Sequence, residues 1–264
     1  MTVSPTPQAL ARPIFLALAA CSLALTSCGD DDEPAAPTEQ VFTGERVAVG
    51  QGEAWTEVTL AADGSPQSLA AVFTEAALEG LPTGHTPPAH EYVLRLPADA
   101  ALAPYDHVTL DWNAHGHAPP GVYDLPHFDV HFYFMSGAQR DAIGPHDSVA
   151  FDAPLPAEML PPMYLETPGG VPRMGAHVID LMSPEIAGTG AFTHTFIYGK
   201  YDGRLNFLEP MVAEDFLRGR PDVEVSIRRP ERYGVSGHLP GAYRVRYEEA
   251  TGTYRVALTD LERR

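Results

Sequence analysis

The sequence predicts an α+β fold, and three observations support this prediction. Apolar and polar residues alternate in several stretches, which is typical of strands that are buried on one face. Short amphipathic segments that begin at capping residues lie between some of these stretches and indicate helices. From residue 127 onward, the expected elements follow the order βαββαβ. We therefore expect a ferredoxin-like βαββαβ core with extra N- and C-terminal strands, and the alternative is a mainly-β, cupin-like barrel.

The elements before this core are expected to be short strands and one helix. Residues 46–60 read as two strands around a glycine turn, and residues 91–97 and 107–113 are also strand-like. Residues 65–80 begin with a serine cap and a proline and end at a glycine, so we expect a helix there. Its apolar stripe would consist of Leu69, Val72, Phe73, Ala76 and Ala77.

The core itself follows a long loop and is interrupted by an irregular excursion at residues 145–190. Its hairpins are indicated by turn residues between alternating segments, and its helices by apolar faces next to polar ones. The expected elements are a strand at 127–135, a helix at 136–144, a hairpin at 191–211, a helix at 212–220, a strand at 222–230 and a C-terminal hairpin across 250–252.

The strand at 127–135 is expected to have one apolar face and one functional face, because side chains alternate along a strand. The apolar face would contain Phe128, Val130, Phe132 and Phe134. The opposite face would contain His127, Asp129, His131 and Tyr133.

Residues 1–27 are typical of the signal peptide of a bacterial lipoprotein. The apolar run Ile14–Leu25 is too short to span a bilayer as a stable helix. It ends in the sequence LTSC, which resembles a lipobox, so Cys28 would be acylated and would become the mature N-terminus. We therefore expect the protein to be anchored to membrane lipid in the cell envelope, outside the cytoplasm.

Residues 28–44 are expected to form an acidic, flexible tether, and residues 45–264 a single globular α+β domain. The two cysteines, Cys21 and Cys28, both belong to the leader, so the mature body has no disulfide and no thiolate metal site. The net charge of −18 argues against nucleic acid as a partner.

The run DWNAHGHAPPGVYDLPHFDVHFY concentrates histidines and aspartates and predicts a metal site. Imidazoles and carboxylates without thiolates suit a divalent ion such as Zn²⁺, Mn²⁺, Fe²⁺ or Cu²⁺. Outer carboxylates would accept hydrogen bonds from the distal N–H groups of the ligating imidazoles. The candidate ligands are His117, His127, His131, His177 and Glu209. The candidate supporting residues around them are Asp111, Asp129 and Tyr133.

The spacing of two candidate ligands limits how they can share an ion. His127 and His131 lie four residues apart, or about 13 Å along a flat strand, which is long for a single ion. A pH-sensitive network, in which imidazoles are bridged by Asp111 and Asp129, is therefore an open alternative.

Three blocks of the chain carry a specific pattern: WNAHGHAPPGVYDLPHFDVHFYFMS, VPRMGAHVIDLMSPE and FTHTFIYGKYDGRLNFLEPM. They resemble the signature of an uncharacterised bacterial family of exported proteins and lipoproteins, which is labelled after a sigma-E-regulated hypothetical protein of a thermophile. The resemblance covers roughly residues 45–262. It implies extracytoplasmic location and homo-oligomerisation, and it brings no established activity. The matching positions are Gly116-His117, residues 126–129, His131, His177 and Glu209-Pro210, whereas His115 is less characteristic.

Two classes of function remain open on the sequence. The first is a lipid-anchored protein with a His-rich metal site; as an enzyme it would use Asp129 or Tyr133 in proton transfer. The second is a non-enzymatic, oligomeric envelope-stress or small-molecule-binding protein whose histidines and aspartates form a structural network.

Overall fold

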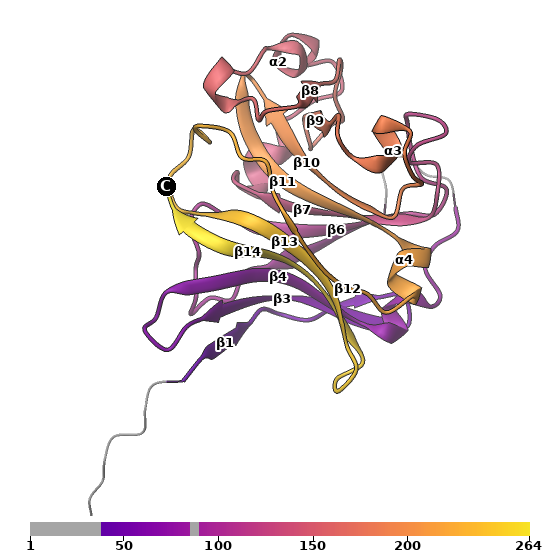
Figure 1. The fold of residues 1–264 in the computed structure, drawn as a ribbon, viewed down its shortest axis with the longest axis vertical. Coiled ribbons are helices and arrows are strands. Elements are labelled where there is room, and N and C mark those ends of the chain that lie inside the picture. The colour runs from indigo at the N-terminus through magenta and orange to yellow at the C-terminus, as the bar shows by residue number, and fades with distance from the viewer. Residues whose placement is uncertain (1–37, 85–89) are drawn as a thin grey trace, which may run out of the picture. The chain divides into compact units, whose positions relative to one another are not determined.

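A computed structural model describes residues 38–84 and 90–264, which belong to one compact unit. Two antiparallel sheets of seven strands each form this unit (Figure 1). The predicted signal peptide and Cys28 lie outside the described residues. The last residues of the predicted tether are part of a sheet, since Gln40–Thr43 form strand β1, which pairs with β3. In the described part of the chain, no helix is long and apolar enough to cross a membrane.

The first sheet has the strand order β1-β3-β4-β14-β13-β12, with β2 also paired to β3. Its strands are β1 (Gln40–Thr43), β2 (Val47–Val49), β3 (Gly52–Leu60), β4 (Pro66–Thr74), β12 (Asp222–Ser226), β13 (His238–Glu248) and β14 (Thr253–Arg263).

The second sheet has the strand order β5-β6-β7-β11-β10-β9-β8. Its strands are β5 (His90–Arg95), β6 (His107–Asn113), β7 (His127–Tyr133), β8 (Tyr164–Glu166), β9 (Ala176–Asp180), β10 (His194–Tyr201) and β11 (Arg204–Ala213). The helical segments are η1 (Glu75–Leu78), α1 (Gly137–Asp141), α2 (Ser148–Asp152), η2 (Ala157–Met159), α3 (Pro184–Ala187) and α4 (Glu214–Arg218).

The main hydrophobic core lies between the two sheets, as in a β-sandwich. The Phe73 ring of β4 and the Phe128 ring of β7 meet there with centroids 5.6 Å apart. The rings of Phe196 in β10 and Tyr243 in β13 meet with centroids 5.4 Å apart. Alternate residues of each strand therefore point into this core, and the other face of the second sheet is left for other contacts.

The expected ferredoxin-like core is wrong. The six expected elements are present as β7, α1, β10, β11, α4 and β12, but α2, β8, β9 and α3 lie between α1 and β10 and interrupt the βαββαβ order. In addition, β7 belongs to the second sheet, whereas β12 pairs with β13 in the first sheet. The helices of that order, α1 and α4, have five residues each and are too short to cover a sheet. The fold is therefore mainly β, and the α+β class is corrected.

The helix expected at residues 65–80 is also wrong, because most of this segment is strand β4. Phe73 faces the core between the sheets, while Val72 packs with Trp55 and Ala257 on the opposite face of the first sheet. A strand that is buried on both faces shows an unbroken apolar run, so its sequence has no period of two.

Several local predictions are confirmed. The β10–β11 hairpin turns at Asp202-Gly203, and the β13–β14 hairpin turns between Glu248 and Thr253. Ser136 caps α1 in a capping box with Gln139.

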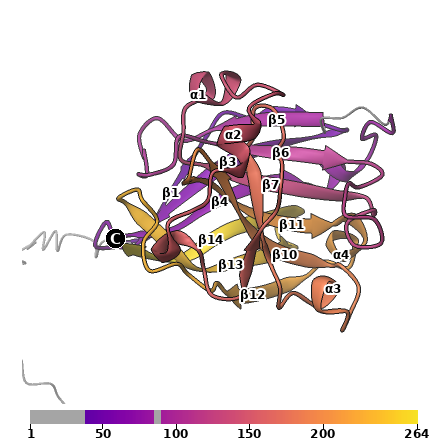
Figure 2. The same ribbon diagram turned by 90° about the horizontal axis from the view of Figure 1, so that it is seen from above.

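The excursion after α1 is more regular than expected. It contributes β8 and β9 to the second sheet, and together with α2 and α3 these lie on the side away from the first sheet (Figure 1). Viewed from above, α2 lies in front of strands of the second sheet (Figure 2).

Candidate metal centre

Polar side chains of β6, β7 and β11 gather on the outer face of the second sheet, which points away from the first sheet. The register pairs Asp111 of β6 with Asp129 of β7, and Thr109 with His131. On the other side of β7, Glu209 of β11 lies between the Phe132–Leu208 and Asp129–Met211 pairs. These side chains are nearly all buried, although they lie outside the core between the sheets.

Two groups of residues on this face could each hold a metal ion. In each group, one ligand atom from every residue lies within 4.8 Å of the others. The His127 group consists of His117, His127 and Asp129, and the Glu209 group consists of His131, His177 and Glu209.

In the His127 group, hydrogen bonds to backbone carbonyls orient both imidazoles. His127 Nδ1 donates to the Leu125 carbonyl at 2.6 Å, and His117 Nδ1 donates to the Ala118 carbonyl at 2.8 Å. Because a carbonyl only accepts, each Nδ1 carries the proton, and a neutral ring then has its lone pair on Nε2. The Nε2 atoms of His127 and His117 face Asp129 at 3.1 and 3.3 Å. The Asn113 amide donates to Oδ2 of the same carboxylate at 2.7 Å.

A glycine turn brings His117 to this group from a loop. Gly116 has a φ of +67°, and a Cβ there would lie 2.0 Å from the Tyr123 carbonyl oxygen. The backbone N–H of His117 donates to that same carbonyl at 3.0 Å. A residue with a side chain at position 116 would therefore displace the loop that carries this imidazole.

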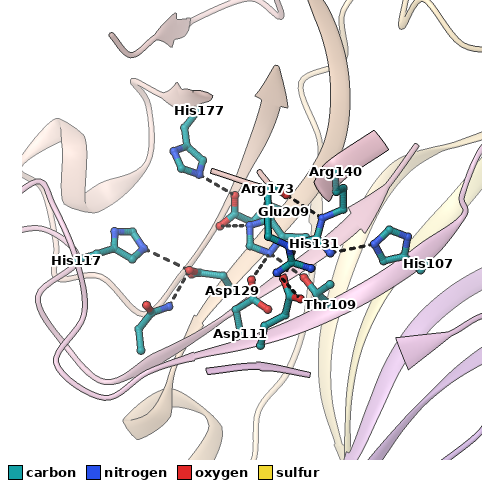
Figure 3. Close-up of polar contacts among 12 residues, drawn as sticks. His107, Thr109, Asp111, His117, Asp129, His131, Arg140, Arg173, His177 and Glu209 are labelled. Atoms are coloured by element: carbon teal, nitrogen blue, oxygen red, sulfur yellow. Dashed lines mark hydrogen bonds and ion pairs between the residues drawn. The ribbon is translucent and has the colours of Figure 1, made fainter. Parts of the chain in front are cut away.

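The Glu209 group draws on three strands. His131 Nδ1 lies 3.1 Å from Asp111 Oδ2, so its other nitrogen faces Glu209, with Nε2 3.5 Å from Oε1 (Figure 3). His177 of β9 points at the other carboxylate oxygen, with Nε2 3.8 Å from Oε2. This is the arrangement of a ligating imidazole whose distal N–H is held by an outer carboxylate.

Gly199 of β10 allows His177 to reach across the sheet. The register places Gly199 between His177 on β9 and Phe207 on β11. A Cβ at position 199 would lie 2.0 Å from the Phe207 ring, so only glycine leaves room for that ring. The Phe207 ring in turn packs edge-on against His131 and His177, with centroid distances of 4.8 and 5.9 Å.

Four candidate ligand atoms are buried and have no hydrogen-bond partner among the described residues. They are His127 Nε2, Asp129 Oδ1, His131 Nε2 and Glu209 Oε2. A buried polar atom without a partner costs about 1–3 kcal/mol. Imidazole nitrogens that face carboxylate oxygens in this way fit a divalent ion, which would satisfy atoms from both kinds of residue.

The charges of the His127 group are strongly coupled. Burial opposes the ionised form of Asp129, but the His127 and His117 imidazoles outweigh burial and hold the pKa of this carboxyl well below its usual range. Burial likewise opposes a charge on His117, but the Asp129 carboxylate outweighs it and raises the pKa of His117 to about 9. Without an ion, His117 is therefore protonated at neutral pH.

In the Glu209 group, the pKa values of Glu209 and His131 are raised, whereas that of His177 is lowered. Burial raises the pKa of Glu209 to about 8, although His131 opposes this shift. Burial opposes a charge on His131, but Glu209 and Asp111 raise the pKa of this imidazole to about 9. Burial and the charges of His131 and His117 lower the pKa of His177 to about 4. His177 is therefore neutral and ready to bind an ion at neutral pH.

A stack of rings and one arginine close the end of the site beside His131. The rings of His107 and Tyr133 stack with centroids 5.0 Å apart, and those of Tyr133 and His131 with centroids 5.5 Å apart. The guanidinium of Arg140 lies 4.1 Å from the Tyr133 centroid and donates to His107 Nε2 at 3.1 Å. The same buried guanidinium pairs with Glu91. Arg140 therefore has its charge balanced away from the candidate ligands.

The structure places all five predicted ligands on one face of the sheet, but it divides them between the two groups. His127 and His131 belong to different groups, as their spacing along the strand indicated. Asp129, expected as a supporting residue, is itself a candidate ligand. Asp111 contacts the distal nitrogen of His131, whereas Tyr133 stacks on that ring.

Sequence reasoning missed several residues around the site. Asn113 and Thr109 follow the same alternation on β6 as Asp111 does, so the period of two could have identified them. Glu91, Arg140 and Arg173 come from separate elements and meet only in the folded chain, so no local pattern indicates them.

Comparison with known protein families shows similarity over part of the chain. The family model described as "TTHB210-like: Hypothetical protein TTHB210" matches residues 62–112, which run from the turn before β4 almost to the end of β6. This match supports similarity to an uncharacterised family. No curated protein and no solved structure matches the chain.

Proposed function

We propose that the protein is a metal-binding protein of the cell envelope, with its ion-binding residues on the outer face of the second sheet. One observation carries this proposal: buried imidazole nitrogens face buried carboxylate oxygens in two places without forming hydrogen bonds to them. The proposed ligands are His117, His127 and Asp129 in one group, and His131, His177 and Glu209 in the other.

The preset orientation of the histidines supports metal binding over a simple polar network. In His127 and His131, Nδ1 is held by an acceptor outside the group, so the Nε2 lone pair of the neutral ring is directed at the proposed ion. A network of neutral hydrogen bonds would instead direct an N–H at the carboxylate in each group.

The ligand set also restricts the ion. Two imidazoles and one carboxylate per group suit Zn²⁺, Mn²⁺, Fe²⁺ or Cu²⁺, and three protein ligands leave coordination positions open. When bound, such an ion supplies Lewis acidity or a metal-bound hydroxide. The chain's own contribution is to orient the imidazoles, through Asp111 and the backbone carbonyls of Leu125 and Ala118.

The second candidate is a structural network without an ion, in an oligomeric envelope-stress or small-molecule-binding protein. The raised pKa values of His117 and His131 favour it, because charged His117 would then pair with Asp129 and charged His131 with Asp111. In such a network, ion pairs between charged imidazoles and carboxylates would satisfy the buried polar atoms without a metal ion.

Metal analysis of the purified full-length protein distinguishes the two candidates. We expect a divalent metal in stoichiometric amount, and we expect a His127→Ala, His131→Ala double variant to lose it. The exposed His146 provides a matched control, since His146→Ala should retain the metal. A chain that takes up no divalent ion, and whose thermal stability does not change with added metal or chelator, would favour the ion-free network.

The proposed location rests on the sequence of the leader. Acylation of Cys28 would hold the protein on membrane lipid outside the cytoplasm, and the acidic charge of the chain argues against nucleic acid as a partner. Mass spectrometry of the N-terminal peptide should show a lipid-modified Cys28, and Cys28→Ala should release the protein from the membrane fraction. A homo-oligomer is expected as well, and light scattering of the purified protein measures its size.

A further inference from the structure

We infer that the His127 and Glu209 groups hold two ions at the same time, and that these ions bind one oxyanion, such as a phosphate or carboxylate group, between them. This inference rests on the proposed metal-binding function. It adds the number of ions and the chemical class of their ligand.

The two groups are neighbours on the sheet. Asp129 and His131 are alternate residues of β7 and point to the same side, about 7 Å apart at the backbone. Glu209 lies on the adjacent strand, opposite this pair. Figure 3 shows the Asp129 and Glu209 carboxylates next to each other, with His117 pointing at the first and His177 at the second.

In each group one histidine is partly exposed to solvent: His117 in the His127 group and His177 in the Glu209 group. The His127 and His131 side chains are fully buried, whereas those of His117 and His177 are 37% and 23% exposed. Each group offers three protein atoms, fewer than the four that Zn²⁺ takes and the six that Mn²⁺ commonly takes. An outside ligand can therefore reach the open positions beside His117 and His177.

Charge selects an anion as that ligand. Two divalent ions bring four positive charges, and the carboxylates at the site are those of Asp129, Glu209 and Asp111. The ligating imidazoles are neutral, and Arg140 is balanced by Glu91. One positive charge is left in a largely buried place, where an unbalanced charge is costly. An oxyanion that bridges the ions neutralises it, as in other two-metal sites.

Manganese and inorganic phosphate test this inference in the full-length protein. We expect two Mn²⁺ per chain, an electron paramagnetic resonance spectrum of exchange-coupled ions, and phosphate binding by the manganese-loaded protein that is at least tenfold tighter than by the metal-free protein. One ion per chain, uncoupled ions, or equal phosphate affinity with and without Mn²⁺ would overturn the inference and leave the proposed function standing. A chain that binds no Mn²⁺, Zn²⁺, Fe²⁺ or Cu²⁺ would overturn both.

Single variants separate two sites from one shared site. We expect His117→Ala and His177→Ala each to retain one Mn²⁺ and to lose at least tenfold in phosphate affinity, while His146→Ala keeps two ions and the phosphate. Circular dichroism checks that each variant is folded. If either folded single variant loses both ions together, the ligands serve one shared ion, and the two-ion centre is excluded.

Discussion

The Asp111 carboxylate lies 3.1 Å from Nδ1 of His131 and so determines which nitrogen of that buried ring faces Glu209. Asp111 belongs to β6 and His131 to β7, and the strand register brings them together on the outer face of the sheet. The orientation of His131 toward Glu209 is therefore set by the strand register of the sandwich and does not depend on a loop.

Replacing Asp111 tests this orientation. In Asp111→Asn the side chain no longer carries the charge that holds the Nδ1 proton of His131, so the ring loses its preferred tautomer. Loss of such an outer partner typically costs 10–100-fold in metal affinity. We expect a decrease of about tenfold or more, measured by competition with a chelator. Asp106→Asn is the control because Asp106 contacts His107 outside both groups, and equal affinities of the two variants would contradict the role of Asp111.

Gly199→Ala tests the reach of His177 across β10. The new methyl group would lie 2.0 Å from the Phe207 ring, which would have to move toward His131 and His177. Overpacking of this kind costs about 1–3 kcal/mol, and we expect the free energy of unfolding to fall by that amount together with a loss of metal affinity. In Gly137→Ala, the control, nothing lies within 4 Å of the new atom. Urea denaturation that shows equal stability for both variants would exclude a steric role for Gly199.

Metal binding should release protons at neutral pH. The pKa values of His117 and His131 are raised to about 9 and that of Glu209 to about 8, so these groups hold protons at pH 7 in the metal-free protein. An incoming ion must displace those protons, so apparent affinity should increase as the pH rises toward about 9 and level off above it. The pKa of His177, about 4, adds no dependence in this range.

Calorimetry in two buffers of different ionisation enthalpy measures this release directly. A binding heat at pH 7 that does not depend on the buffer would show that no protons leave, in conflict with protonated ligands.

Glu91→Gln should destabilise the fold. Arg140 is 2% exposed and would lose its charged partner, and breaking such a buried pair costs about 3 kcal/mol. Arg218 and Glu79 form an exposed pair, so Glu79→Gln should cost less than about 1 kcal/mol. Denaturant unfolding compares the two, and a loss in Glu91→Gln no larger than in the control would contradict a stabilising role for this pair.

The same pair predicts an acid limit to stability. Burial opposes the charge of Glu91, but Arg140 and Arg173 outweigh burial and lower the pKa of this carboxyl in the folded state. The ionised Glu91 carboxylate therefore stabilises the fold fully at a pH above the pKa that Glu91 has in the unfolded chain. This stabilisation is lost as the pH falls through the lower pKa that Glu91 has in the folded protein. Glu91→Gln should lack this part of the acid dependence, and identical pH profiles for the variant and the parent protein would contradict it.

Local patterns in the sequence predicted which side of strand β7 is polar and which is buried, but they did not predict the fold. The alternation from His127 to Tyr133 is set within one strand, so it correctly separated the buried Phe128, Val130 and Phe132 from the polar row. Strand β12 belongs to the first sheet because it pairs with β13. The alternation of apolar and polar residues within a strand does not show which other strand it pairs with. For the same reason, the spacing along the strand indicated that His127 and His131 would not share an ion, but the pairing of His131 with Glu209 required the register of β7 against β11.

Anomalous diffraction from crystals grown with Zn²⁺ or Mn²⁺ tests whether ions bind on the outer face of the second sheet. We expect anomalous peaks about 2.0–2.2 Å from Nε2 of His131 and from Nε2 of His127. Crystals with saturating metal that show no peak at either nitrogen, and in which protonated imidazoles donate directly to Asp129 and Glu209, would contradict a metal centre on this sheet.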